Sequence, residues 1–265
     1  MTAIGVVGTD FGFIVAADGR VRLDDESRSH ATPEMLTQES DEQQKNFPIT
    51  DAEKNLAYAI TGSTGDPRGF DLLKIIPAQI RRISNRRFND GCHYVKVLSE
   101  KINEGINDAK RGGAIKAFPQ IDHLEQSTGW LIVRVFFVGY FDRIPCFVRA
   151  DFVHFGGDSE SRVSAYAPRY SILSGSDAVR REIYEDNGHV LAGSRFASYI
   201  KDLGSNPSLD DAEEYARGFI EACSSSLALE LDEARCKGIG GSIHVAEITP
   251  SGFKWRVAPK KRETA

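Results

Sequence analysis

Two residues near the start of the chain, Thr2 and Asp18, have the types and spacing of a nucleophile and a carboxylate that assists it. The runs 3–8 and 13–20 suit β-strands, and the short segment 9–12 suits a turn between them. A hairpin of this length returns Asp18 to the level of Thr2 on the neighbouring strand. A methionine before a small residue is normally removed during synthesis, so we expect Thr2 to carry a free α-amino group beside its hydroxyl.

The α-amino group matters because a threonine hydroxyl is a weak nucleophile at neutral pH and needs a base. An α-amino group has a pKa of about 7.7–8.0 and a lysine ammonium one of about 10.4, so only the former is substantially deprotonated at neutral pH. A lysine serves better as a fixed positive charge that lowers the hydroxyl pKa. Lys45 opens the extended run 45–49, and the order of elements brings it toward Asp18, whose carboxylate offsets the burial of the ammonium.

A glycine at the end of the next run, Gly62, suits the stabilisation of a developing oxyanion. The run 56–61 ends at this glycine, and the segment 63–67 carries an N-cap residue and a proline suited to a first helical turn. Exposed backbone N–H groups at such a junction can hold a developing negative charge, and glycine lets a substrate backbone approach closely.

The motifs around these residues resemble those of the proteasome β-type peptidases of the N-terminal-nucleophile hydrolase superfamily. The motifs are Thr2, Ala17-Asp18-Gly19-Arg20, Lys45-Asn46-Phe47-Pro48-Ile49 and Thr61-Gly62-Ser63-Thr64-Gly65-Asp66. In that family the threonine is the nucleophile, an aspartate and a lysine orient and activate it, and a glycine supplies an oxyanion-hole N–H. The resemblance assigns these roles to Thr2, Asp18, Lys45 and Gly62, with Arg20 supporting the Asp18 loop. It covers the first sixty-odd residues well and the remainder by element order only.

Several supporting positions depart from the family pattern. Proteasome β-type peptidases usually carry an aspartate and a serine before the glycine pair of the penultimate strand, where residues 236–241 here read Cys-Lys-Gly-Ile-Gly-Gly. Another supporting serine of the family is matched only approximately by Ser174 or Ser176, so either serine or neither serves. The long polar segment 29–44 stands where the family has a shorter loop, and it either rims the active-site cleft or forms a mobile excursion.

Hydrophobic periodicity predicts further helices and strands beyond residue 62. Predicted helices lie at 70–83 (with Pro77 as a kink or break), 94–109, 177–185, 192–203 and 209–231. Predicted strands lie at 130–140, 144–152, 169–173, 242–249 and 252–257. This order is that of an α+β four-layer α-β-β-α sandwich built on two antiparallel sheets. We expect a single domain over residues 1–265, with a polar insertion at 29–44 and a basic tail at 258–265.

Composition and charge argue against several function classes. The formal net charge of −5 argues against generic nucleic-acid binding. No secretory or transmembrane segment precedes the first strand and the four cysteines lack paired metal spacing, so we expect a protein of the reducing cytoplasm without a membrane partner. The six histidines lack the spacing of a metal site, and the expected reaction needs neither a metal nor an organic cofactor.

The sequence therefore predicts a threonine hydrolase, most simply a peptidase that cleaves amide bonds of peptides or unfolded proteins through an ester on Thr2. Two other functions stay open: an amidohydrolase for a small-molecule amide, and a non-catalytic scaffold of the proteasome-like kind. The altered residues at 236–241 also leave open a relative that folds and assembles without turnover.

The resemblance implies assembly as well, because such peptidases enclose their sites within rings. We expect a homo-oligomer, either a closed ring or an open helical filament, and an unfoldase partner is compatible with this interpretation. The helix expected to begin near Asp66 offers Phe70, Leu73, Ile76 and Ile80 as contact residues between subunits.

Overall fold

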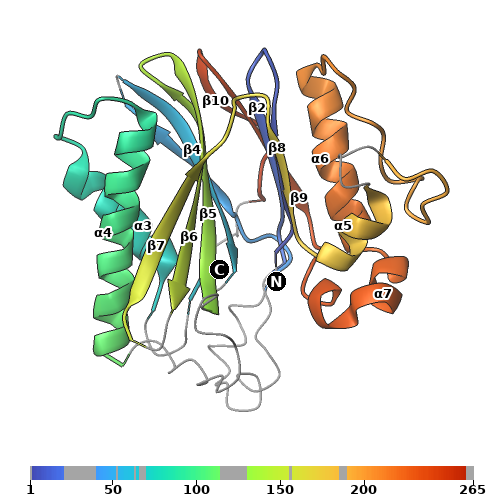
Figure 1. Cartoon of the computed structure of the whole chain (residues 1–265), viewed down its shortest axis with the longest axis horizontal. Helices are drawn as coiled ribbons and strands as arrows, with labels where there is room; N and C mark the ends of the chain where they lie inside the picture. The colour runs from blue at the N-terminus through green and yellow to red at the C-terminus, as the bar shows by residue number, and fades with distance from the viewer. Residues whose placement is uncertain are drawn as a thin grey trace.

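Two five-stranded sheets lie face to face in the centre of the molecule and helices cover both outer faces (Figure 1). The computed structural model describes residues 2–20, 40–51, 53–62, 64–65, 70–113, 130–154, 157–184 and 190–260. Within these ranges, every pair of neighbouring strands is antiparallel. The α+β four-layer sandwich predicted from the element order is confirmed.

The first sheet has the strand order β10-β9-β2-β1-β8. Its strands are β1 (Ile4–Gly8), β2 (Phe13–Asp18), β8 (Ser171–Ser174), β9 (Ile243–Thr249) and β10 (Gly252–Val257). In the β1–β2 hairpin Ile4 pairs with Ala17, which brings Asp18 opposite Ala3 and next to Thr2. The central strands of this sheet thus come from the two ends of the chain.

The second sheet has the strand order β3-β4-β5-β6-β7. Its strands are β3 (Asn46–Thr50), β4 (Lys54–Gly62), β5 (Trp130–Phe141), β6 (Ile144–His154) and β7 (Ser159–Ala165). Strand β4 ends at Gly62, as predicted, and β3 begins directly after Lys45. Two of the proposed site residues therefore border strands of this second sheet.

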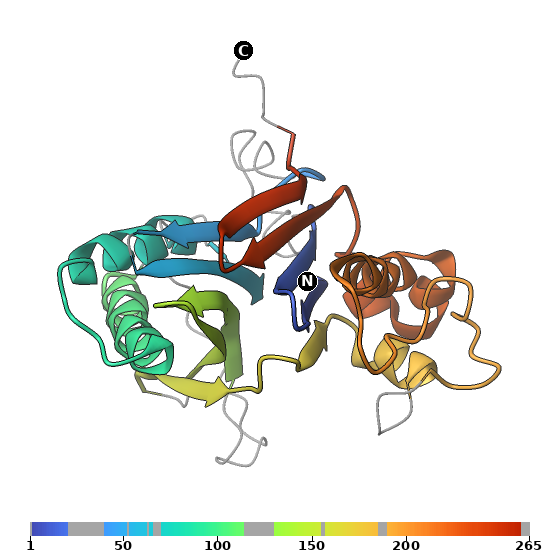
Figure 2. The same cartoon turned by 90° about the horizontal axis from the view of Figure 1, so that it is seen from above.

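The helices form the two outer layers, which Figure 2 shows from above on opposite sides of the paired sheets. Helices α3 (Leu72–Ile83) and α4 (Gly91–Arg111) cover the second sheet. Helices α5 (Asp177–Ile183), α6 (Leu209–Cys223) and α7 (Ser226–Cys236) cover the first. Each begins at an aspartate or serine whose side chain accepts a backbone N–H of the first turn. None of the helices in the described ranges has both the length and the apolar character needed to cross a bilayer.

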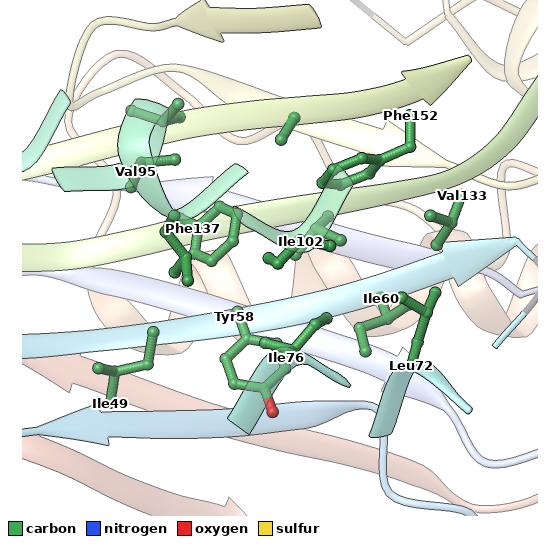
Figure 3. Packing of buried hydrophobic residues seen from close by; sticks show 14 of the residues in the cluster. Ile49, Tyr58, Ile60, Leu72, Ile76, Val95, Ile102, Val133, Phe137 and Phe152 are labelled. Atoms are coloured by element: carbon green, nitrogen blue, oxygen red, sulfur yellow. The ribbon is translucent and has the colours of Figure 1, made fainter. Parts of the chain in front are cut away.

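Three hydrophobic clusters hold these layers together. Between the sheets, aromatic residues such as Phe13, Phe136 and Phe147 pack with small and β-branched residues of both sheets. Beneath α3 and α4, a second cluster fills the outer face of the second sheet, where Tyr58, Leu72 and other residues interdigitate (Figure 3). A third cluster lies between the first sheet and helices α5 to α7.

The second cluster corrects the expectation for subunit contacts. Phe70 and Ile76 are buried within it, and Leu73 and Ile80 pack against it. These four apolar side chains therefore stabilise the fold itself, since the amphipathic face of α3 turns toward its own sheet rather than toward solvent.

Several predicted helices differ from the observed ones. The segment 192–203 forms turns rather than a helix: Gly193 has a φ of +81°, and Ser194 accepts the Phe196 N–H at 3.1 Å. Such local side-chain bonds compete with helical ones. The predicted helix 209–231 is two helices, because Ser225 interrupts it and caps α7.

Two further differences concern the beginning of α3 and the edge of the second sheet. Helix α3 begins at Leu72, with Asp71 as its cap, and Pro77 lies inside it without ending it. Strand β7 was not predicted, because its sequence Ser-Glu-Ser-Arg-Val-Ser-Ala lacks a hydrophobic alternation. As an edge strand with largely exposed side chains, it is held by its pairing with β6.

Candidate active site

Asp18 lies at the end of β2, fully buried, and its carboxylate accepts hydrogen bonds from four donors. Its Oδ1 accepts the Ala3 backbone N–H at 2.8 Å, and its Oδ2 accepts the Gly240 N–H at 3.1 Å and the Arg20 N–H at 3.2 Å. The fourth donor is Lys45, whose Nζ lies 3.1 Å from Oδ1. These hydrogen bonds offset the desolvation cost that a charged carboxylate would otherwise have in the protein interior.

Lys45 is as buried as its partner, with 3% of its side chain exposed. Its ammonium also donates to the Arg20 carbonyl at 2.7 Å. The backbone of this lysine is fixed by the second sheet, because its carbonyl accepts the Ile60 N–H at 3.1 Å. The side chain thus reaches from the edge of the second sheet to the end of β2 in the first.

Burial and pairing act in opposite directions on the two charges. Burial raises the pKa of the Asp18 carboxyl above its ordinary value, while Lys45 and the Gly240 and Ala3 N–H groups oppose that rise. Burial likewise lowers the pKa of the Lys45 ammonium, and Asp18 opposes that change. Each charge of this buried pair is stable only while the other is present, because removal of one partner leaves an uncompensated buried charge.

Thr2 is 5% exposed and lies just before β1. Its carbonyl accepts a hydrogen bond from the Thr61 hydroxyl at 3.1 Å, which ties the start of the chain to the end of β4. The next residue, Ala3, donates to Asp18. The structure therefore places the Asp18–Lys45 ion pair beside Ala3, the residue that follows Thr2.

Gly62 follows Thr61 directly and lies at this same end of the sandwich. Its φ of +109° is one that residues with a side chain rarely adopt. A Cβ atom here would lie 2.9 Å from the Ile132 carbonyl oxygen and 3.0 Å from the Val133 Cα. Both the conformation and the close packing against β5 require glycine at this position.

Arg20 and residues 40–44 make further contacts around the end of β2, where Asp18 lies. The Arg20 guanidinium donates to Asp41 Oδ1 at 2.9 Å and to the Ile239 carbonyl at 3.0 Å. The Gln43 N–H donates to the Gly19 carbonyl at 2.8 Å. Of the predicted polar insertion, residues 29–39 lie outside the described residues, whereas residues 40–44 pack against the site.

The two serines considered from the sequence have different positions. Ser174 pairs with Ile4 at the end of β8. Ser176 is fully buried, caps α5 by accepting the Val179 N–H, and donates to Asp232 Oδ2 at 2.6 Å. Ser176 therefore belongs to a part-buried polar pair that Ser174 does not share.

Asp232 was not identified from the sequence. It lies within α7 at a non-helical φ of −151° and ψ of 67°, a kink that turns its carboxylate toward Ser176. It precedes Gly240 by eight positions, so no short motif marks it. A carboxylate therefore does reach Ser176, although the residues immediately before the glycine pair carry none.

Metal ligands are not gathered in the described part of the chain: no three His, Cys, Asp or Glu side chains come together there as a metal site needs. The polar groups that do converge, around Asp18, form an ion pair with hydrogen-bond donors. Such an arrangement suits nucleophilic chemistry on the adjacent threonine.

Comparison with known proteins finds similarity at the level of structure. No family model matches the sequence, and no curated protein does. Anbu (ancestral beta-subunit) from Yersinia bercovieri matches with a TM-score of 0.54 at 12% identity, covering 98% of this chain and 88% of that chain. A Gly-1 mutant of Anbu from Hyphomicrobium sp. strain MC1 matches with a TM-score of 0.54 at 11% identity, covering 99% of this chain and 89% of that chain. A helical assembly of the Anbu complex from Pseudomonas aeruginosa matches with a TM-score of 0.54 at 11% identity, covering 99% of this chain and 88% of that chain.

These comparisons correct the family that the sequence motifs suggested. The assignment to the proteasome β-type peptidases was wrong: no family model supports it, and the similar structures are Anbu proteins. A few motif residues do not separate one family from another that has the same fold. At 11–12% identity, the similarity establishes that this chain has the proteasome-like fold of the Anbu proteins.

Proposed function

We propose that the protein is an N-terminal threonine hydrolase that cleaves amide bonds through an ester intermediate on Thr2. The observation that carries this proposal is the buried Asp18–Lys45 pair, 3.1 Å between Nζ and Oδ1, directly beside the start of the chain. A buried ion pair is weak evidence for stability, because two apolar side chains of similar volume are often as stable. Its position next to a potential nucleophile gives it a chemical role.

The first half of the reaction would form the acyl-enzyme. Removal of Met1 would free the Thr2 α-amine, which takes the proton from Oγ as Oγ attacks the amide carbonyl. The nearby Lys45 ammonium lowers the pKa of the hydroxyl electrostatically, and Asp18 keeps that ammonium in place. The Gly62 N–H would hold the oxyanion. As the carbonyl re-forms, the C–N bond breaks and the leaving amine takes the proton from the α-ammonium.

The second half would release the acid product. The α-amine takes a proton from a water molecule, which attacks the ester carbonyl while Gly62 again holds the oxyanion. Collapse of this intermediate returns the proton to Thr2 Oγ. Arg20 would keep the loop after Asp18 in place, and the Ser176–Asp232 pair would support the other side of Thr2, leaving Ser174 without a chemical role.

The unit that performs this reaction would be one domain over the whole chain. The cluster between the sheets joins strands from both halves of the sequence, which supports this organisation. One of the similar structures is described as a helical assembly of the Anbu complex, and we infer that this chain also forms a homo-oligomer through heterologous contacts. Enclosure in such an assembly would favour peptides as substrates.

Intact-mass analysis and covalent labelling test the proposal together. The purified protein should lack Met1, and a peptide epoxyketone or boronate should add to Thr2. Thr2→Ala should abolish the labelling. Thr9→Ala is a matched control, because Thr9 is another buried threonine beside β1, at the opposite end of the strand, and should leave labelling unchanged. Labelling that persists in Thr2→Ala, or a retained Met1 with full activity, would exclude Thr2 as the nucleophile.

A further inference from the structure

A buried histidine next to the site has no hydrogen-bond partner in the described part of the chain. His244 lies on β9, pairs with Ala17 next to Asp18, and has a fully buried side chain. Neither its Nδ1 nor its Nε2 makes a hydrogen bond. Leaving a buried polar group unpaired costs about 1–3 kcal/mol, so such a group needs an explanation.

The nearest polar atom is a carboxylate oxygen that also lacks a partner. Glu42 Oε2 lies 3.6 Å from His244 Nε2 and is itself buried without a hydrogen bond. The other oxygen, Oε1, accepts the Ser242 hydroxyl, and Lys260 Nζ lies 3.8 Å from it. A movement of less than about 1 Å would bring Nε2 and Oε2 to ordinary hydrogen-bond distance.

Glu42 belongs to the short segment that delivers Lys45 to Asp18. Between them, Gln43 donates its N–H to the Gly19 carbonyl, and the neighbouring Asp41 carbonyl accepts the Ser242 N–H. A hydrogen bond between Glu42 and His244 would therefore fix this segment on the first sheet three residues before Lys45. The position of the Lys45 ammonium depends on where that segment lies.

The charged groups that face the imidazole come from three directions. Glu42 lies on the segment before β3, Lys45 at the start of β3, and Asp18 at the end of β2. Lys260 faces Glu42 from beyond β10. Burial, helped by Lys45, lowers the pKa of His244, and Glu42 and Asp18 oppose this, so the imidazole is neutral at pH 7.

We propose that neutral His244 donates its Nε2–H to Glu42 and thereby positions Lys45 for the reaction, and that protonation of His244 impairs the reaction. This inference rests on the function proposed above. A protonated imidazole adds a second buried cation beside Lys45, and the two cations compete for the Asp18 carboxylate. His244 is a positioning residue, since it acts through Lys45 rather than on the substrate.

Variants at position 244 separate a donor role from simple packing. In His244→Gln, the amide nitrogen can take the place of Nε2, so the variant should keep most of the labelling rate at pH 8. His244→Leu has similar bulk but no donor, and should lose about 10²-fold in rate, the effect of a misplacement of about 1 Å. Equal losses in the two variants, with folding confirmed by circular dichroism, would overturn the donor role.

The pH dependence of Thr2 labelling is a readout that a purely structural role would not change. As the pH falls below the lowered pKa of His244, the wild type should lose rate with a slope approaching two in log rate against pH, one proton on the α-amine and one on His244. His244→Gln should show a slope of one. His154→Gln is the control, because His154 also has a pKa lowered by burial but contacts Lys110 of α4 rather than the segment that carries Lys45. It should keep the slope of two.

The outcomes distinguish this inference from the proposed function. If the wild type is not labelled at Thr2 at any pH, the proposed function fails. If it is labelled but wild type and His244→Gln share the same acid slope, the proposed function stands and the role of His244 is excluded.

Discussion

Lys45 Nζ lies 3.1 Å from Asp18 Oδ1 although the two residues are 27 positions apart in sequence, and both side chains are almost fully buried. The aspartate ends a strand of the first sheet and the lysine directly precedes a strand of the second. The ion pair therefore spans the two sheets at the place where Thr61 also binds the Thr2 carbonyl. The candidate site residues therefore come together only where the two sheets pack against each other.

Replacement of Lys45 should affect both stability and reactivity. Lys45→Met leaves the buried Asp18 without its counter-charge, which should lower the free energy of unfolding by about 3–5 kcal/mol. It should slow Thr2 labelling by roughly 10²–10³-fold, the range typical of a lost electrostatic stabiliser in an active site. Urea unfolding and labelling kinetics measure the two effects separately.

Lys54→Met is the matched control for that experiment. Lys54 is also a buried lysine, with its Nζ 2.6 Å from Asp51, but it opens β4, whereas the site lies at the end of that strand. Asp51 is partly exposed, so its charge stays solvated after the substitution. Stability should fall by less than in Lys45→Met, and labelling should be unchanged. Equal losses of labelling in the two variants would mean that burial of a lysine, rather than its position, matters.

A methyl group at Gly62 should disturb the end of β4. Gly62→Ala forces a residue with a Cβ into a φ of +109° and against the Ile132 carbonyl, so the loss should be at least about 1–2 kcal/mol. The N–H of residue 62 would shift with the strand, and labelling should slow. Gly157→Ala is the control, because a Cβ there meets no atom within 4 Å. It should stay within about 0.5 kcal/mol of the wild type.

The parts of the fold that could be predicted are those whose signals are local. The β1–β2 hairpin follows from two β-branched and aromatic runs around a short turn, and the end of β4 follows from Gly62. The hairpin positions Asp18 next to Thr2, and the end of β4 positions Gly62. The long apolar strands β5 and β6 were predicted for the same reason.

The parts that could not be predicted depend on distant partners. Asp232 reaches Ser176 only because α7 kinks, and the two residues are 56 positions apart. Strand β7 has no apolar pattern and exists because β6 offers it an edge. His244 reads as an ordinary strand residue, and only the fold brings Glu42 close to it.

Ser176 should affect reactivity beyond its role as a helix cap. Ser176→Ala removes the cap of α5 and the donor to Asp232, and should cost about 1–3 kcal/mol together with a slower labelling of Thr2. Ser208→Ala removes the equivalent cap of α6, which lies in the same helical layer. It should cost about 1 kcal/mol and leave labelling unchanged. Equal labelling rates in the two variants would show that Ser176 acts only as a helix cap.

The alkaline side of the activity profile should report the ionisation of Lys45. The charged ammonium is the active form, and burial lowers its pKa, so activity should fall as the pH rises through a value below the pKa of about 10.4 of a free lysine. Lys45→Arg keeps its charge at every pH in this range, since a guanidinium has a pKa above about 12. Its activity should be lower overall, because the guanidinium geometry differs, but should show no alkaline decline. Lys54→Arg should retain the wild-type profile, and circular dichroism at each pH excludes unfolding as the cause. An identical alkaline decline in Lys45→Arg and wild type would assign that ionisation to another group.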